Sequence, residues 1–189
     1  MARLPLPGRE LTGGGAAGFD PEAARLDPEA AARAIPAGVR TIAAILRGAG
    51  HEAHLVGGCV RDLLRGVTPE DWDVATDARP DRLLALLPGA RYDNRFGTVA
   101  VPFPDGAHEV TTFRRDGTYS DHRRPDDVTF GDALEEDLAR RDFTINAMAI
   151  PLAADGAPGE PVDRFGGRDD LAAGILRAVG DPGARFRED

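Results

Sequence analysis

A glycine pair between a short strand and a helix constrains the fold of this chain more than any other feature. Residues 54–56 read as a strand, Gly57 and Gly58 follow, and the apolar spacing of residues 60–66 is helical. Glycines at such a turn let a backbone approach phosphate closely, and a helix N-terminus presents free N–H groups. Arg61, one turn into the helix, could add a charge-assisted contact to a triphosphate. Taken alone, these residues fit a tight turn with a surface arginine at least as well.

Two aspartates follow this helix, and they are the first candidates for metal ligands. Asp71 and Asp73 flank Trp72, so on a strand both carboxylates project from one face and the indole from the other. A pair of hard oxygen ligands suits Mg²⁺, which retains water and takes substrate phosphates as further ligands. An isolated Asp-x-Asp pair is more often a solvated loop, so this hypothesis depends on its context.

Two further groups of polar residues supply that context. Glu109 lies on the second strand of a predicted hairpin and is a candidate third carboxylate, or else a charged residue on the solvent face of that strand. Arg140, Arg141 and Asp142 come just before the apolar segment 143–150. Two guanidinium groups beside a carboxylate can clamp phosphates and ribose, but an arginine pair is equally often ordinary surface.

The remaining pattern predicts one folded domain over residues 28–189, preceded by a flexible segment over residues 1–27. The polar segment 114–127 is long for a hairpin loop, which makes it either mobile or functional. The expected elements are a helix over 28–50 broken at Pro36, a strand over 71–74, a helix over 80–87, hairpin strands over 98–103 and 108–113, a helix over about 134–148, and a short helix between glycine turns at 166–167 and 180–183.

Composition excludes several classes of protein. No apolar run approaches the roughly 20 residues of a membrane span, and the N-terminus lacks a secretory signal, so we expect a cytoplasmic protein. Cys59 is the single cysteine, so the chain has no disulfide partner, and we expect a small buried side chain there rather than a nucleophile. The formal charge of −9 argues against RNA at first sight, but a metal-dependent nucleotide enzyme needs carboxylates at its centre.

Five motifs together carry a resemblance to a known family. In order along the chain they are LVGGCVRDLLRG, EDWDVAT, EVTTFR, EEDLARRDFTINAMA and DRFGGRDDLAAGILRAVGDPGARFRED. They resemble the head domain of bacterial class II tRNA nucleotidyltransferases, the CCA-adding enzymes, and of their poly(A) polymerase relatives. The resemblance implies an α+β fold of the polymerase-β nucleotidyltransferase superfamily, a mixed sheet with packed helices.

The same resemblance implies roles for individual residues. Asp71 and Asp73 become the ligands of two Mg²⁺ ions, and Glu109 becomes the third acidic residue. The residues implied to bind the nucleotide are Gly57, Gly58 and Arg61 around the triphosphate, Arg140, Asp142 and Asn146 near the sugar and phosphates, and Asp189 in a base-selecting motif. The loop 114–127 resembles a flexible segment implicated in switching between nucleotides.

The implied activity is addition of nucleotides from CTP and ATP to the 3′ end of tRNA, as in CCA addition or repair, by two-metal phosphoryl transfer. The arginines that follow Glu188 and Asp189 in the family are absent, as are the neck, body and tail, so the sequence is expected to be a truncated head. The alternatives are a nucleotide-binding but inactive fragment and a poly(A) polymerase head. A dinucleotide-binding oxidoreductase fails because the turn has no G-x-G-x-x-G.

Overall fold

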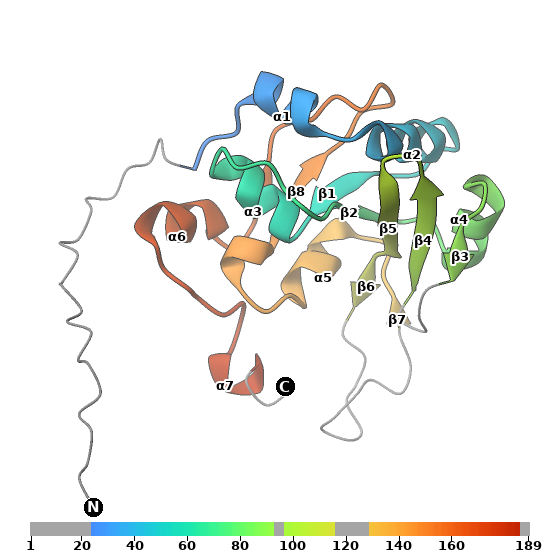
Figure 1. Ribbon diagram of the computed structural model, residues 1–189. Helices are drawn as coiled ribbons and strands as arrows, with labels where there is room; N and C mark the ends of the chain where they lie inside the picture. The colour runs from blue at the N-terminus through green and yellow to red at the C-terminus, as the bar shows by residue number, and fades with distance from the viewer. Residues whose placement is uncertain (1–23, 93–96, 116–128, 186–189) are drawn as a thin grey trace, which may run out of the picture.

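A mixed sheet of seven strands forms the centre of the computed structural model, which describes residues 24–92, 97–115 and 129–185 (Figure 1). The order is β3-β4-β5-β2-β1-β8-β9, with β2 parallel to β5 and the other neighbours antiparallel. The strands are β1 (His54–Val56), β2 (Asp73–Thr76), β3 (Arg91–Tyr92), β4 (Thr98–Phe103), β5 (Gly106–Thr112), β8 (Met148–Pro151) and β9 (Val162–Asp163). A separate ribbon pairs β6 (Arg114–Arg115) with β7 (Thr129–Phe130). The predicted α+β class is confirmed.

Helices cover both faces of the sheet. They are α1 (Pro28–Ala34), α2 (Ala37–Gly48), α3 (Gly58–Leu64), α4 (Pro80–Leu86), α5 (Leu134–Ala139), α6 (Gly167–Ala173) and α7 (Pro182–Arg185), with a 3-10 turn η1 (Thr144–Asn146). Asp27 caps α1 by accepting the backbone N–H groups of Glu29 and Ala30, each at 3.0 Å. The expected break at Pro36 is confirmed, because a residue before proline favours extended backbone and Ile35 is extended.

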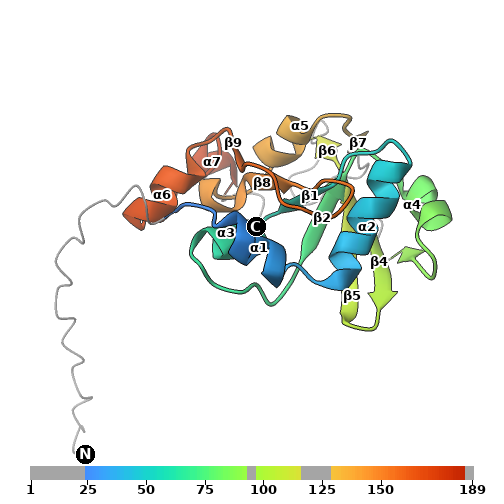
Figure 2. The same ribbon diagram turned by 90° about the horizontal axis from the view of Figure 1, so that it is seen from above.

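The two sheet faces bury separate cores. In Figure 2, α1 and α2 lie on one side of the sheet and α5 on the other. The larger core joins Leu55, Val74 and Val110 to apolar side chains of α1, α2, α3 and α4. The smaller core joins Val56, Ala75 and Ala149 to Phe113 and to two leucines of α5. Since successive residues of a strand face opposite ways, Val74 points into the larger core and Asp73 lies on the face covered by α5.

Two sequence predictions were wrong in their bounds. The helix expected over 134–148 ends at Ala139, and after a turn and η1 the chain enters β8. The run Met148–Ile150 is wholly buried between β1 and β9, and a short apolar run of that kind does not distinguish a central strand from a buried helix. The strand expected over 71–74 begins only at Asp73, so Asp71 lies just ahead of it.

The other expected elements agree closely with the structure. The strand, glycine turn and helix around Gly57, the helix near 80–87, the hairpin and the short helix after residue 166 are all confirmed. Residues 1–23 and 116–128 lie outside the described residues. The flexible N-terminal segment and most of the polar loop 114–127 therefore remain predictions. Within the described ranges, no helix is long and apolar enough to cross a membrane.

Candidate active site

The glycine turn between β1 and α3 passes directly over the side chains of Asp73 and Arg141. Gly57 has a φ of +74°, which favours glycine. A Cβ atom built at Gly57 would lie 2.9 Å from Nη1 of Arg141 and 3.6 Å from Oδ2 of Asp73. Glycine at this position therefore both forms the turn and leaves room for two charged groups beneath it.

Asp73 is the first residue of β2 and is partly buried, whereas Asp71 is exposed. Burial raises the pKa of Asp73, the guanidinium of Arg141 acts against that rise, and the charge of Asp71 adds to it. A carboxylate whose charge is disfavoured in this way, next to a second carboxylate, is stabilised by a cation. The donors are hard oxygens, so the pair fits the divalent Mg²⁺ that the sequence predicts.

Glu109 on β5 is the direct partner of Asp73 in the parallel β2–β5 ladder. Residues paired in this way project from the same face, so the predicted third acidic residue shares the face of Asp73. Among the described residues, no three His, Cys, Asp or Glu side chains form a group that could hold a metal. An ion bound to the aspartate pair would take its other ligands from water and phosphate, as Mg²⁺ commonly does.

Arg61 on α3 links the glycine turn to the segment after α5. Its Nε donates to Oδ1 of Asp62 at 2.9 Å, and its Nη1 donates to Oδ1 of Asn146 at 3.2 Å. Asn146 in turn donates from Nδ2 to Oδ1 of Asp142 at 3.3 Å. The structure thus brings together three predicted residues from two distant motifs. A Cβ at Gly58 would lie 3.6 Å from Nη2 of Arg61, an ordinary contact, so this second glycine is not required by space.

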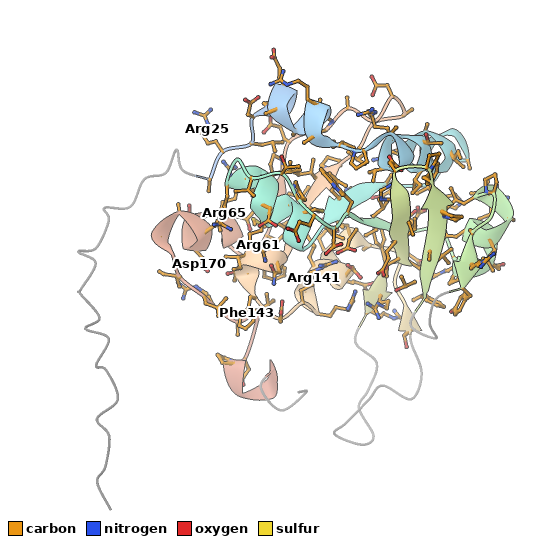
Figure 3. All side chains as sticks on the ribbon, in the orientation of Figure 1. Arg25, Arg61, Arg65, Arg141, Phe143 and Asp170 are labelled. Carbon is orange, nitrogen blue, oxygen red and sulfur yellow. The ribbon has the colours of Figure 1, made fainter. Side chains whose placement is uncertain are left out.

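The arginine pair after α5 differs from the sequence prediction in one respect. Arg140, which was assigned to the nucleotide, donates from Nε and Nη2 to Oδ1 of Asp137 at 3.0 and 2.7 Å. Arg141, which the sequence pattern offered as a phosphate clamp but the family resemblance did not assign, is the arginine next to Asp73 and Gly57, on the same side of the molecule as Arg61 (Figure 3). Sequence reasoning did not single out Asp137. The available signal was spacing, since residues 137 and 141 lie one turn apart at the end of a helix.

Cys59 and Asp189 are the remaining positions discussed in the sequence analysis. Cys59 is buried, its thiol donates to the carbonyl of Val56 at 3.1 Å, and burial raises the pKa of this thiol to about 11. A small buried side chain was expected there, and the structure confirms it. Asp189 lies outside the described residues.

A mixed sheet of this order, with an aspartate pair at the start of a central strand beside a glycine turn, is that of a polymerase-β-like nucleotidyltransferase head. The chain belongs to the Poly A polymerase head domain family, whose sequence profile matches residues 53–177.

Curated proteins similar to this chain are CCA-adding enzymes. The chain is 50% identical over 141 residues to the CCA-adding enzyme of Geobacillus thermodenitrificans, covering 74% of this chain and 34% of that one. It is 46% identical over 149 residues to the enzyme of Bacillus subtilis, covering 78% of this chain and 36% of that one. The chain therefore spans about a third of the length of the curated relatives it matches.

Solved structures of similar proteins agree with this family. The Bacillus stearothermophilus CCA-adding enzyme in complex with CTP has a TM-score of 0.67 and 40% identity, covering 82% of this chain and 37% of that one. The Thermotoga maritima CCA-adding enzyme complexed with tRNA has a TM-score of 0.61 and 26% identity, covering 82% of this chain and 36% of that one. Both similarities extend over most of this chain and only the corresponding part of the larger proteins.

Proposed function

We propose that this chain is the nucleotide-transferring head of a CCA-adding tRNA nucleotidyltransferase. One observation supports the proposal above the others: the Gly57 turn lies over a partly buried aspartate and an arginine at the same point. That arrangement offers a site for a cation and a site for an anion side by side. A metal-bound nucleoside triphosphate needs both.

In this proposal Asp71 and Asp73 hold two Mg²⁺ ions, and Glu109 on the same sheet face is the third acidic residue. The bound ions would lower the pKa of an RNA 3′ hydroxyl and neutralise charge on the triphosphate. The hydroxyl oxygen attacks the α phosphorus in line, its proton passes to solvent water, and the bond between the α phosphorus and the leaving pyrophosphate breaks. The RNA is then one nucleotide longer.

The arginines and the η1 segment orient the nucleotide. Arg61 and Arg141 both reach Asn146, one at its side-chain Oδ1 and the other at its backbone carbonyl, so their charges lie on two sides of the same residue. We assign both guanidinium groups to phosphate oxygens, and Asp142 and Asn146 to the ribose. Arg140 lies next to them and keeps its predicted place near the sugar and phosphates.

The substrates in this proposal are CTP, ATP and the 3′ end of tRNA. Relatives of this chain have solved structures with CTP, with ATP and with tRNA, which supports the choice. We place the activity in the cytoplasm, where tRNA is found. Residues 28–189 act as the head, and grip on the rest of the tRNA is assigned to the part of the relatives that this chain does not cover.

The test uses the purified chain and a control with both Asp71→Ala and Asp73→Ala. Each is incubated with Mg²⁺, labelled CTP or ATP, and tRNA that lacks its 3′ CCA. We expect label to enter the RNA with the parent chain and near-complete loss with the control. An Asp73→Ala protein that transferred nucleotides at a comparable rate would contradict the metal-ligand assignment.

The pattern of incorporation separates the proposed function from its alternatives. One to three nucleotides added in the order C, C, A indicate CCA addition or repair, whereas a long tract of A indicates a poly(A) polymerase head. If the parent binds Mg²⁺–nucleotide, the control does not, and neither adds label, the chain is a binding-competent head that is inactive alone.

A further inference from the structure

Asp137 is a buried carboxylate behind the candidate active site, and it accepts hydrogen bonds from three arginines. Its side chain is 1% exposed, and it lies on α5, under the turn that carries Arg140 and Arg141. Oδ1 accepts Nε and Nη2 of Arg140 at 3.0 and 2.7 Å and the backbone N–H of Arg114 at 3.2 Å. Oδ2 accepts Nη2 of Arg141 at 3.2 Å. Both oxygens are therefore used, and each is directed to a different arginine side chain.

The cluster holds more positive than negative charge. Burial would raise the pKa of Asp137, but the charges of Arg140 and Arg141, together with the hydrogen bonds from Arg140 and the Arg114 backbone, lower that pKa, so the carboxylate is ionised. Burial and the neighbouring charge of Arg140 lower the pKa of Arg114 to about 10, which leaves it protonated at neutral pH. Arg140 and Arg141 thus donate to Asp137 through their side chains and Arg114 donates through its backbone N–H, while Asp73 lies beside Arg141 as a second carboxylate. An anion at the front of the cluster would meet three guanidinium charges and two carboxylates.

Arg141 is the member of the cluster that faces forward. On one side its Nη2 is bound to Asp137; on the other, its Nη1 lies 3.5 Å from the carbonyl of Asn146 and under the turn at Gly57. An arginine side chain has many rotamers, and a guanidinium bound at one nitrogen to a buried carboxylate keeps few of them. The direction of Arg141 therefore depends on Asp137.

We propose that Asp137 is a positioning residue that holds the Arg141 guanidinium against Gly57 and Asp73, where a nucleoside triphosphate enters. The inference rests on the proposed function, because it assigns Arg141 to phosphate. Asp137 does not touch the nucleotide. It acts through Arg141, and removal of its charge leaves Arg141 present but misdirected.

The first test is a double-mutant cycle on nucleotide binding by the full chain. Kd for Mg²⁺–CTP is measured for the parent, Asp137→Asn, Arg141→Ala and the double variant. We expect Asp137→Asn to weaken binding roughly tenfold, and to have no further effect once Arg141 is alanine. Equal weakening in both backgrounds would overturn the inference, because Asp137 would then act independently of Arg141.

The matched control is Asp77→Asn. Asp77 also accepts a backbone N–H, that of Glu52 at 2.7 Å, but it follows the opposite end of β2 from Asp73. The Asp77→Asn substitution should lower the melting temperature without changing Kd for Mg²⁺–CTP.

Asp137→Glu keeps the negative charge but displaces the carboxylate. A positioning role predicts that this variant does not bind Mg²⁺–CTP as tightly as the parent, and binding as tight as that of the parent would contradict the role. This variant also replaces Asp137→Asn if the latter fails to fold.

A second readout does not depend on nucleotide at all. In chain labelled with ¹⁵N-arginine, the Nη–H resonances assigned to Arg141 by their absence in Arg141→Ala include the Nη2 group bound to Asp137. They should lose protection from solvent exchange in Asp137→Asn and keep it in Asp77→Asn. Unchanged protection in Asp137→Asn would overturn the inference. A parent that binds no Mg²⁺–CTP but shows the expected change in exchange would refute the proposed function and leave the positioning role intact.

Discussion

Asp73 and Glu109 are paired residue to residue across the parallel β2–β5 ladder, so their carboxyl groups leave the same face of the sheet. Their backbone positions are fixed by strand pairing rather than by a loop, and Val74 and Val110, the next pair along, are both completely buried. The spacing of the two acidic side chains is therefore set by the core behind them.

The first prediction concerns Glu109. Glu109→Gln keeps the shape and removes the charge, so the Mg²⁺ concentration for half-maximal transfer should rise and the maximal rate should fall roughly 100-fold, about 2.7 kcal/mol of transition-state stabilisation. Glu70→Gln is the control, since Glu70 is exposed and precedes β2. A magnesium titration of labelled CTP transfer measures both effects. An unchanged magnesium dependence would remove Glu109 from the site.

Gly57→Ala should damage the site more than the fold. The new methyl group would meet Arg141 at 2.9 Å, and the positive φ adds about 1–2 kcal/mol of strain. Gly50→Ala is a matched control, because Gly50 has a φ of +84° and no described residue lies within 4 Å of a Cβ atom built there. Both variants should melt at lower temperature, but only Gly57→Ala should lose binding of Mg²⁺–CTP. Similar binding of Mg²⁺–CTP by the two variants would contradict a role for the Gly57 turn in nucleotide binding.

His54 predicts how stability depends on pH. Burial lowers its pKa in spite of the hydrogen bond with Glu52 at 2.7 Å, and its Nδ1 is buried with no hydrogen-bond partner among the residues that the structure describes. The unfolded chain, with a histidine pKa near 6.5, binds a proton before the folded chain does. The free energy of unfolding should therefore fall as pH drops from about 7 through 6.5 toward the folded pKa.

Urea denaturation at several pH values measures this effect. His54→Gln should flatten the curve between pH 7 and the folded pKa of His54, because the buried titrating group is gone. A curve of the same slope in the parent and the variant would show that another group is responsible. Loss of the ionised Asp137, whose pKa is lowered, belongs to a more acidic range, below the usual aspartate pKa of about 3.9.

The Cys59 thiol should be unreactive in the folded protein. Its thiol is buried and its pKa is about 11, so thiolate is scarce at neutral pH and reagent access is poor. We expect a thiol-specific chromogenic disulfide to react with Cys59 only after denaturant is added, and Cys59→Ala to keep its transfer rate. Fast labelling of native protein, or loss of transfer in Cys59→Ala, would show that the thiol takes part in function.

Local patterns were enough to predict the parts of the site that lie next to a turn or on a short strand. The glycine turn, Asp73 and Arg61 each sit where the spacing of apolar residues and glycines puts them. Glu109 could be proposed as a partner, but its alignment with Asp73 depends on the register of β5 against β2, which no local pattern specifies.

The arginine pair was harder for a physical reason. Which of Arg140 and Arg141 faces Asp73 depends on the residue at which α5 ends, and the helix was expected to continue to about residue 148. A longer helix would have turned the two side chains in other directions. The partner that fixes them, Asp137, is the last of three consecutive acidic residues, and no local pattern indicates that the structure buries it.

The parallel pairing of β2 with β5 also bears on how the protein folds. Between the two strands the chain passes through α4, β3 and β4, so this pairing is a long-range event that closes after the local hairpin and helices. Asp73 and Glu109 are far apart until that closure occurs. Chains stalled before it would keep much of their helix yet lack a metal site, so recovery of Mg²⁺ binding during refolding would report when β2 and β5 pair.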